Sequence, residues 1–217
     1  MKIEIKDLGK RFDQWVFQHL NYSFLGEKSY VITGASGSGK STLLFLLAGL
    51  DLPTAGEIWI ETTSQKEGFF LHSLKDKQRA LFRRYQVGMV FQNHFLLSAL
   101  NNWENILLPA KIRGVEITPV LKNKALDLAK SLGVADTLKR YPYEVSGGQQ
   151  QRLSILRAIL LSPEFLFCDE PTGALGKDQA EEVMKLLLSL HKSYASTLVC
   201  VTHNERVLSL FDYHFPF

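Results

Sequence analysis

The sequence predicts an α/β fold in which a mostly parallel sheet carries helices on both faces. Short apolar runs alternate with stretches of helical periodicity, which is typical of parallel strands joined by helices. A glycine-rich loop joins the first apolar run directly to an apolar helix. With 217 residues, 46% of them hydrophobic, the chain is long enough to bury such a core. The expected buried strands cover residues 29–33, 87–91, 164–168 and 197–201.

Two alternating segments predict a smaller antiparallel sheet near the N-terminus. Ile3 and Ile5 alternate with charged residues, and Ile58 and Ile60 flank Trp59. An apolar residue at every second position indicates strands with one buried face. We therefore expect a small antiparallel sheet beside the parallel one.

The middle of the chain predicts an inserted helical subdomain. Thr118 and Pro119 are expected to be the N-cap and first residue of a helix that ends at Gly133. Further helical periodicity continues to about residue 160. We expect a single domain over residues 1–217. Its α/β core, with the antiparallel sheet, covers residues 1–92 and 161–217, and its helical subdomain covers residues 93–160.

Composition argues against several classes of function. The net charge of +3 is too small to indicate nucleic-acid binding, and a basic helix from a cap at Ser73 to about Arg84 is expected to be a solvated face. The longest apolar run, residues 43–50, is far shorter than the roughly 20 residues of a membrane span, so we expect no direct membrane insertion. Cys168 and Cys200 lie inside apolar runs, which favours buried thiols over a disulfide or metal pair.

The loop at residues 34–41 fits the phosphate-binding pattern G-x-x-x-x-G-K-[ST], with a strand before it and a helix after it. Glycines let backbone N–H groups turn toward phosphate oxygens, and the helix N-terminus adds partial positive charge. Lys40 is expected to bind the β- and γ-phosphates of a nucleoside triphosphate, and the Ser41 hydroxyl to coordinate Mg²⁺. The expected nucleotide-binding residues of this segment are Gly34, Ala35, Ser36, Gly37, Ser38, Gly39, Lys40, Ser41 and Thr42.

The groups that hydrolyse the nucleotide are expected at the ends of other strands. Asp169 and Glu170 directly follow a buried strand, at the edge where α/β sheets present ligands. Asp169 suits binding of Mg²⁺, directly or through water, and Glu170 suits a general base that activates water. Gln92 is long enough to reach the metal or the attacking water, and His203 can donate a hydrogen bond to the γ-phosphate.

Ser146, Gly147, Gly148 and Gln149 form a second anion-binding segment, because they precede another helix. One nucleotide does not need two phosphate cradles from the same chain. We therefore expect a homodimer in which the Ser146 segment of each copy closes over the phosphate loop of its partner. The nucleotide then joins the two copies, and hydrolysis releases them.

Together these motifs resemble the ATP-binding subunits of ABC transporters over nearly the whole chain. The resemblance implies ATP and Mg²⁺ as cofactors. It also implies that Phe12 stacks on adenine, with Trp15 as the alternative, and that Val145 replaces the usual leucine of the signature. Residues 34–41 resemble the Walker A loop, Gln92 the Q-loop, and residues 145–149 the signature. Residues 165–169 resemble the Walker B motif, with Glu170 as the catalytic glutamate, and His203 matches the H-loop.

Further strings resemble the branch that contains lipoprotein-releasing, macrolide-exporting and division-associated ATPases. The resemblance implies a homodimer docked on a membrane permease, located in the cytoplasm and peripheral on the cytoplasmic face of the inner membrane. The strings are residues 88–92, 104–106 with Pro109, 140–142, 146–152 and 171–175.

The implied function is ATP hydrolysis that drives the permease, in lipoprotein release or export. The alternative is a regulatory ABC ATPase that transmits force to a membrane partner without moving a solute. A soluble ABC ATPase of DNA repair or translation is not expected, because the chain has one cassette and no heptad run.

The chain also departs from the family pattern. Gly176 stands where the family usually has an aspartate that couples the two ATP sites, and Asp178 is the nearest replacement. The aromatic segment 211–217 is expected to finish the sheet, cap the core or contact a partner. Apolar residues near the Q-loop are candidates for a permease-docking groove or for the core, namely Phe91, Phe95, Leu96 and Leu97.

Overall fold

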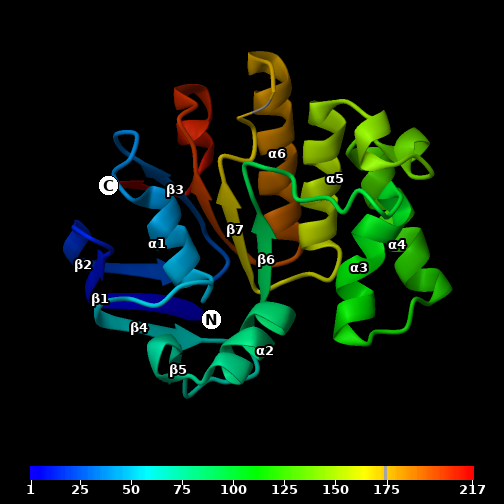
Figure 1. The fold of residues 1–217 in the computed structure, drawn as a ribbon. Helices are drawn as coiled ribbons and strands as arrows, with labels where there is room; N and C mark the ends of the chain where they lie inside the picture. The colour runs from blue at the N-terminus through cyan, green and yellow to red at the C-terminus, as the bar shows by residue number, and fades with distance from the viewer. Residues whose placement is uncertain (174) are drawn as a thin grey trace.

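The computed structural model describes residues 1–173 and 175–217, and it contains two sheets flanked by helices (Figure 1). The larger sheet has the strand order β6-β7-β8-β3-β9, and all its pairings are parallel. Its strands are β3 (Ser29–Thr33), β6 (Val87–Val90), β7 (Phe165–Asp169), β8 (Thr197–Val201) and β9 (Tyr213–Pro216). The predicted parallel sheet is therefore confirmed.

The smaller sheet is antiparallel and has the order β2-β1-β4-β5. Its strands are β1 (Lys2–Arg11), β2 (Trp15–Leu25), β4 (Ala55–Glu61) and β5 (Phe69–Phe70). Ile3 pairs with Ile60, and Ile5 pairs with Ile58. All four side chains are buried, as their alternation with polar residues predicts.

Alternate residues of the central strands enter two separate cores. Phe165, Phe167 and Val199 pack toward α1 and the antiparallel sheet. Cys168 and Cys200 face the opposite way, into the core shared with α5 and α6. Both cysteines are free thiols, and burial raises the pKa of each above its usual range. The expected buried, unpaired cysteines are confirmed.

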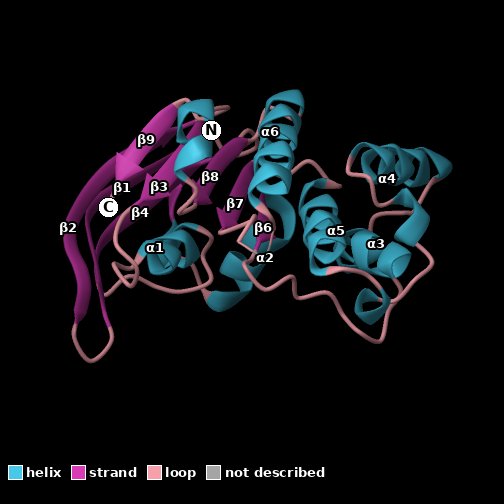
Figure 2. Ribbon diagram, turned by 90° about the horizontal axis from the view of Figure 1, so that it is seen from above, coloured by secondary structure: helices cyan, strands magenta, loops and turns pink. Residues whose placement is uncertain are grey.

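The helices cover both faces of the parallel sheet (Figure 2). Helix α1 packs on one face, against β7 and β8, whereas α6 packs on the other. The α-helices are α1 (Lys40–Leu47), α2 (Asp76–Gln86), α3 (Asn102–Arg113), α4 (Pro119–Ser131), α5 (Gly147–Ile159) and α6 (Lys177–Ser193). Short 3₁₀ helices cover Leu71–Ser73, Ala135–Thr137, Pro142–Glu144 and Glu205–Leu210.

The predicted helix caps are correct at one site and wrong at another. The Thr118 side chain accepts a hydrogen bond from the Leu121 N–H at 3.3 Å, with Pro119 as the first residue of α4. Ser73 does not cap α2, because its hydroxyl donates to the Phe70 carbonyl at 2.8 Å. The N-cap of α2 is Lys75, two residues later, which places Ser73 in a 3₁₀ turn.

The aromatic C-terminal segment completes the parallel sheet. Strand β9 pairs with β3, and the Phe217 N–H donates to the Thr33 carbonyl at 2.7 Å. Phe215 is buried, and its ring stacks on Tyr22 with 4.2 Å between the centroids. Of the three roles expected for this segment, the structure supports the first two.

We expect Phe215→Ala to lower the free energy of unfolding by about 3 kcal/mol, because it leaves a cavity between the two sheets. Urea unfolding followed by circular dichroism measures the change. Phe12→Ala is the matched control, since Phe12 is 63% exposed and its loss is expected to cost no more than about 0.5 kcal/mol. Equal effects of the two substitutions would contradict the placement of β9.

Candidate functional site

Parallel strands bring the expected catalytic residues to one edge of the sheet. The phosphate loop follows β3, Asp169 is the last residue of β7, and Glu170 comes directly after it. Asp169 pairs in register with Val201, two residues before His203. Val90, which pairs with Cys168, comes two residues before Gln92. Residues separated by more than a hundred positions therefore meet at the carboxyl ends of four adjacent strands.

The phosphate loop has the backbone that its glycines allow. Gly37 and Gly39 have φ values of 78° and 103°, which residues with a side chain rarely adopt. The Lys40 ammonium lies within the loop and donates to the carbonyls of Gly34 at 3.1 Å and Ala35 at 2.6 Å. The loop is thus a closed turn around a buried cation, at the N-terminus of α1.

Ser41 links this loop to the carboxylate on β7. Its hydroxyl donates to Asp169 Oδ1 at 2.9 Å. Burial raises the pKa of Asp169, the hydrogen bond from Ser41 lowers it, and the nearby charge of Glu170 raises it. A hydroxyl and a carboxylate oxygen in contact are the hard oxygen ligands that suit Mg²⁺. Two of the three residues predicted to hold the metal, Ser41 and Asp169, are therefore in contact, whereas the role of Gln92 stays a prediction.

Glu170 is held in an unusual conformation beside His203. Its φ is 45°, although it is not glycine, and its N–H donates to the Val201 carbonyl at 2.9 Å. Its Oε1 lies 3.1 Å from His203 Nε2. Such backbone strain persists only where surrounding contacts over-determine it. Both side chains line a cavity of about 450 Å³ that also includes Thr172 and Glu205.

Gln92 is exposed, and the chain that follows it is fixed to α5. Arg157 donates to the carbonyls of His94 at 2.9 Å and Phe95 at 2.7 Å. The His94 ring also hydrogen-bonds the side chain of Gln151. Sequence analysis missed this clamp, because its partners are backbone carbonyls some sixty positions away and leave no pattern in the sequence.

The Ser146 segment does not join the phosphate loop in the same chain. Ser146 caps α5, where its hydroxyl accepts from the Gln149 N–H at 3.3 Å and Gln149 Oε1 accepts from the Ser146 N–H at 3.0 Å. Helix α5 and helix α1 stand apart in both views, with β7 and α6 between them (Figures 1 and 2). A Cβ atom on Gly147 would meet nothing within 4 Å. The start of α5 is therefore open to another molecule.

Phe12 and Trp15 lie in and beside the turn between β1 and β2. Phe12 is 63% exposed, with the Lys10 ammonium 4.9 Å from its ring centre. Trp15 is 43% exposed, and its ring packs close to Gly9. The ring of Phe12 is the more accessible of the two, and its stacking on adenine stays a prediction.

The four apolar docking candidates differ in exposure. Phe95 and Leu97 are exposed, whereas Leu96 packs against the core of the helical region. The Phe91 ring lies between Phe45 and Phe95, with centroid distances of 6.2 and 5.1 Å. Phe95 and Leu97 are therefore the two that a partner can reach.

Gly176, at the departure from the family pattern, is the N-cap of α6, where glycine offers no side chain to cap the helix. Ala174 and the side chain of Asp178 lie outside what the structure describes. Whether Asp178 replaces the missing aspartate therefore stays a prediction.

Comparison with known proteins places these motifs in one family. The profile of the ABC transporter family matches residues 17–173. A lipoprotein-releasing system ATP-binding protein LolD from Psychrobacter arcticus is 39% identical over 83% of this chain and 77% of the relative. A LolD from Treponema denticola is 39% identical over 91% of this chain and 84% of the relative.

Solved structures agree with these sequence matches. A dimeric structure of MJ0796, a bacterial ABC transporter cassette, superposes with a TM-score of 0.87 at 30% identity, over 99% of this chain and 94% of the other. A dimeric post-hydrolysis state of MJ0796 bound to ADP and Pi gives a TM-score of 0.85 at 31% identity, over 97% and 93% of the two chains. The predicted fold is therefore confirmed, and the chain belongs to the ABC transporter family as an ATP-binding cassette.

Proposed function

We propose that this chain is the ATP-hydrolysing subunit of a membrane transport complex and works as a homodimer around two molecules of MgATP. The proposal rests on one observation, namely that the two predicted phosphate-binding segments of the chain lie apart from each other. Lys40, Ser41, Asp169, Glu170 and His203 meet at one edge of the sheet, whereas the Ser146 segment stands apart. A second copy supplies that missing side. The dimeric assembly of the MJ0796 cassette supports this arrangement.

Each residue of the site has a role in the proposed reaction. Lys40 and the backbone N–H groups of residues 34–41 hold the β- and γ-phosphates. Glu170 accepts the proton of the water that attacks the γ-phosphate, and Gln92 orients that water. His203 Nε2, which lies 3.1 Å from Glu170 Oε1, exchanges that partner for a γ-phosphate oxygen when ATP binds. The Ser146 hydroxyl and the start of α5, on the partner, bind the same phosphate from the other side.

The residues present fit a single Mg²⁺ ion. The described part of the chain has no cluster of three or more His, Cys, Asp or Glu side chains suited to a metal. Ser41 and Asp169, with Gln92 from the segment after β6, would hold this cation together with phosphate oxygens and water. When bound, Mg²⁺ neutralises charge on the phosphate oxygens as the terminal phosphate leaves.

We expect Ser41→Ala to raise the Mg²⁺ concentration that supports half-maximal ATPase activity at least about tenfold, because one oxygen ligand is lost. Titration of Mg²⁺ at saturating ATP measures this shift. Ser38→Ala is the matched control, because Ser38 lies in the same loop but is not a proposed metal ligand. An unchanged Mg²⁺ requirement in the Ser41 variant would exclude Ser41 as a ligand.

We further propose that the membrane partner is a permease and that lipoprotein release is the work performed, on the basis of the LolD relatives. In the described residues no helix has the length and hydropathy of a membrane span. On the basis of the same relatives, we propose that a separate permease carries the membrane function, with this chain peripheral on the cytoplasmic face of the inner membrane. Residues 93–160 form the helical subdomain that moves against the core, and Phe95 and Leu97 belong to the docking region.

Reconstitution tests this proposal. The purified chain is combined in vesicles with the membrane protein that co-purifies with it, and release of a labelled lipoprotein is followed. We expect release that requires ATP and fails with Lys40→Ala. ATPase activity without release of any lipoprotein or solute would instead favour the regulatory alternative, in which the chain transmits force to its partner.

A further inference from the structure

Two stacked tyrosines form an exposed aromatic surface directly before the Ser146 segment. The rings of Tyr141 and Tyr143 are nearly parallel, with an interplanar angle of 11° and 5.6 Å between their centroids. Tyr143 is 70% exposed, whereas Tyr141 is 39% exposed. Tyr141 therefore supports one face of the Tyr143 ring, and the other face is open to another molecule.

The turn that carries Tyr143 is fixed to the start of α5. It is the 3₁₀ helix Pro142–Glu144, which ends just before the cap of α5. The side-chain amide of Gln150, within α5, donates to the carbonyls of Pro142 at 2.9 Å and Val145 at 3.3 Å. The fold therefore fixes where Tyr143 lies relative to the Ser146 segment.

This turn lies toward the same edge of the parallel sheet as the nucleotide site. A short connection joins the end of α5 at Ile159 to the start of β7 at Phe165, so the helix and the strand run in opposite directions (Figure 1). The start of α5, with the tyrosines before it, therefore lies toward the carboxyl end of β7. Tyr143 precedes Ser146 by three positions, which span at most roughly 10 Å. A nucleotide whose terminal phosphate contacts Ser146 therefore extends past the neighbourhood of Tyr143.

Phe12 can cover only one face of a base. Its ring is 63% exposed, and the Lys10 ammonium, 4.9 Å from the ring centre, occupies one side of that ring. Lys10 is itself fixed, because its ammonium donates to Asp51 Oδ1 and to the Leu52 carbonyl, both at 2.8 Å. One face of Phe12 therefore remains for the base, and the second face of that base is left for another group. In a nucleoside triphosphate the base and the terminal phosphate lie at opposite ends, so a partner group that covers the base must lie beside the Ser146 segment and not within it.

We propose that Tyr143 of one copy stacks on the base of the nucleotide whose phosphates the other copy holds. The base then lies between Phe12 of one copy and Tyr143 of its partner. The inference rests on the proposed function, because it needs a dimer that shares each nucleotide. Two aromatic faces favour a two-ring purine over a one-ring pyrimidine, since a larger flat surface is stacked. Tyr143 is thus a specificity-determining residue that favours ATP over UTP.

The kinetics of the full chain test this inference. Tyr143→Ala is expected to raise the KM for ATP at least about fivefold, the loss expected for one base-stacking contact, with kcat within about twofold of the parent. The KM for UTP is expected to rise less than about twofold, so the preference for ATP falls. Tyr143→Phe keeps the ring and should behave like the parent. Tyr85→Ala is the matched control, because Tyr85 is 44% exposed but belongs to α2.

A mixture of two inactive variants shows which copy supplies the tyrosine. When Lys40→Ala and Ser146→Glu copies pair, the working site combines the phosphate loop of the Ser146→Glu copy with the Ser146 segment of the Lys40→Ala copy. Tyr143→Ala added to the Lys40→Ala copy is expected to raise the KM of the mixture for ATP at least about fivefold. The same substitution in the Ser146→Glu copy is expected to leave that KM unchanged, because its tyrosine belongs to the inactive site.

An unchanged KM for ATP in the Tyr143→Ala chain, or an equal rise for ATP and UTP, would overturn the inference. So would a raised KM when the substitution is in the Ser146→Glu copy, because that result places the tyrosine beside the nucleotide of its own chain. Loss of association with a membrane protein at an unchanged KM would also overturn it, and would assign Tyr143 to partner docking. The proposed function fails separately, if the parent chain neither hydrolyses ATP nor dimerises with it.

Discussion

Replacing Glu170 with glutamine is expected to lower ATP hydrolysis at least about a hundredfold while ATP still binds, because the amide cannot take a proton from water. Glutamine has nearly the same shape, so its oxygen can keep the contact that Glu170 makes with His203 Nε2 at 3.1 Å. ATP binding through Lys40 and Ser41 does not involve this side chain. ATP should therefore remain trapped, and dimers should accumulate.

Two measurements check this result. Phosphate release gives the turnover, and size-exclusion chromatography with light scattering gives the mass with and without ATP. Glu205→Gln is the control, because Glu205 is a second carboxylate that lines the same cavity and has no proposed role. Turnover equal to that of the parent would reject Glu170 as the base. A monomer at high protein concentration with ATP, with the permease supplied, would reject the shared site.

Mixing two inactive variants is expected to restore ATP hydrolysis, because each site is built from two chains. Lys40→Ala removes the phosphate grip in one copy, and Ser146→Glu places a negative charge where its partner's phosphate binds. In a mixed dimer one site carries both defects and the other carries neither. Random pairing makes half of the dimers mixed, so activity should recover to roughly a quarter of the parent value if the intact site works alone.

A second mixture controls for unspecific recovery. Lys40→Ala combined with Glu170→Gln puts both defects on the same side of the interface, so each site of a mixed dimer carries one defect. This mixture should stay inactive. Recovery in both mixtures, or recovery with Ser146→Glu alone, would contradict the placement of Ser146 in the partner's site. The size of the recovery also reports how strongly the two sites depend on each other when Gly176 replaces the usual aspartate.

The sequence predicted the site best where residues with a chemical role lie at the carboxyl ends of buried strands. The phosphate loop, Asp169 and His203 follow apolar runs whose parallel pairing brings their ends together, so adjacency could be inferred without coordinates. It failed at Ser73, because the residues before α2 form a 3₁₀ turn that displaces the helix start by two positions. Local hydrogen bonds of Ser compete with capping, and the pattern alone does not distinguish them.

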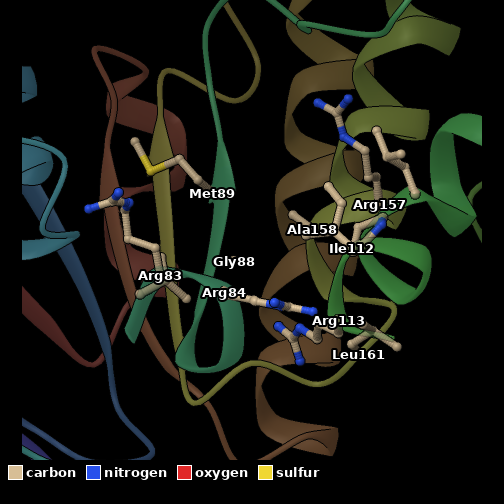
Figure 3. Close-up of a pocket in the computed structure, with 12 residues that line it drawn as sticks. Arg83, Arg84, Gly88, Met89, Ile112, Arg113, Arg157, Ala158 and Leu161 are labelled. Carbon is tan, nitrogen blue, oxygen red and sulfur yellow. The ribbon is translucent and has the colours of Figure 1, made fainter. Parts of the chain in front are cut away.

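Contacts between distant polar groups could not be inferred in the same way. Arg84 and Arg113 belong to different helices, and their approach depends on how α2 and α3 pack beside β6 (Figure 3). The basic residues of α2, among them Arg84, were expected to face solvent. Arg84 and Arg113 are instead half-buried, because neighbouring elements of the tertiary structure cover them. The strained φ of Glu170 is equally invisible, because it follows from the tight return of the chain beside β8.

The attachment of residues 94 and 95 to α5 has a mechanical consequence. Helix α5 is a stiff rod that carries Ser146 at its tip and Arg157 along its shaft. Any tilt of that rod must shift the stretch after Gln92 and the tip by related amounts. We therefore expect that a displacement of Gln92 on loss of the terminal phosphate is transmitted through α5 to Ser146, with which the same copy contacts its neighbour. Release of the terminal phosphate and separation of the two copies would then be one coupled movement of α5 and not two separate events.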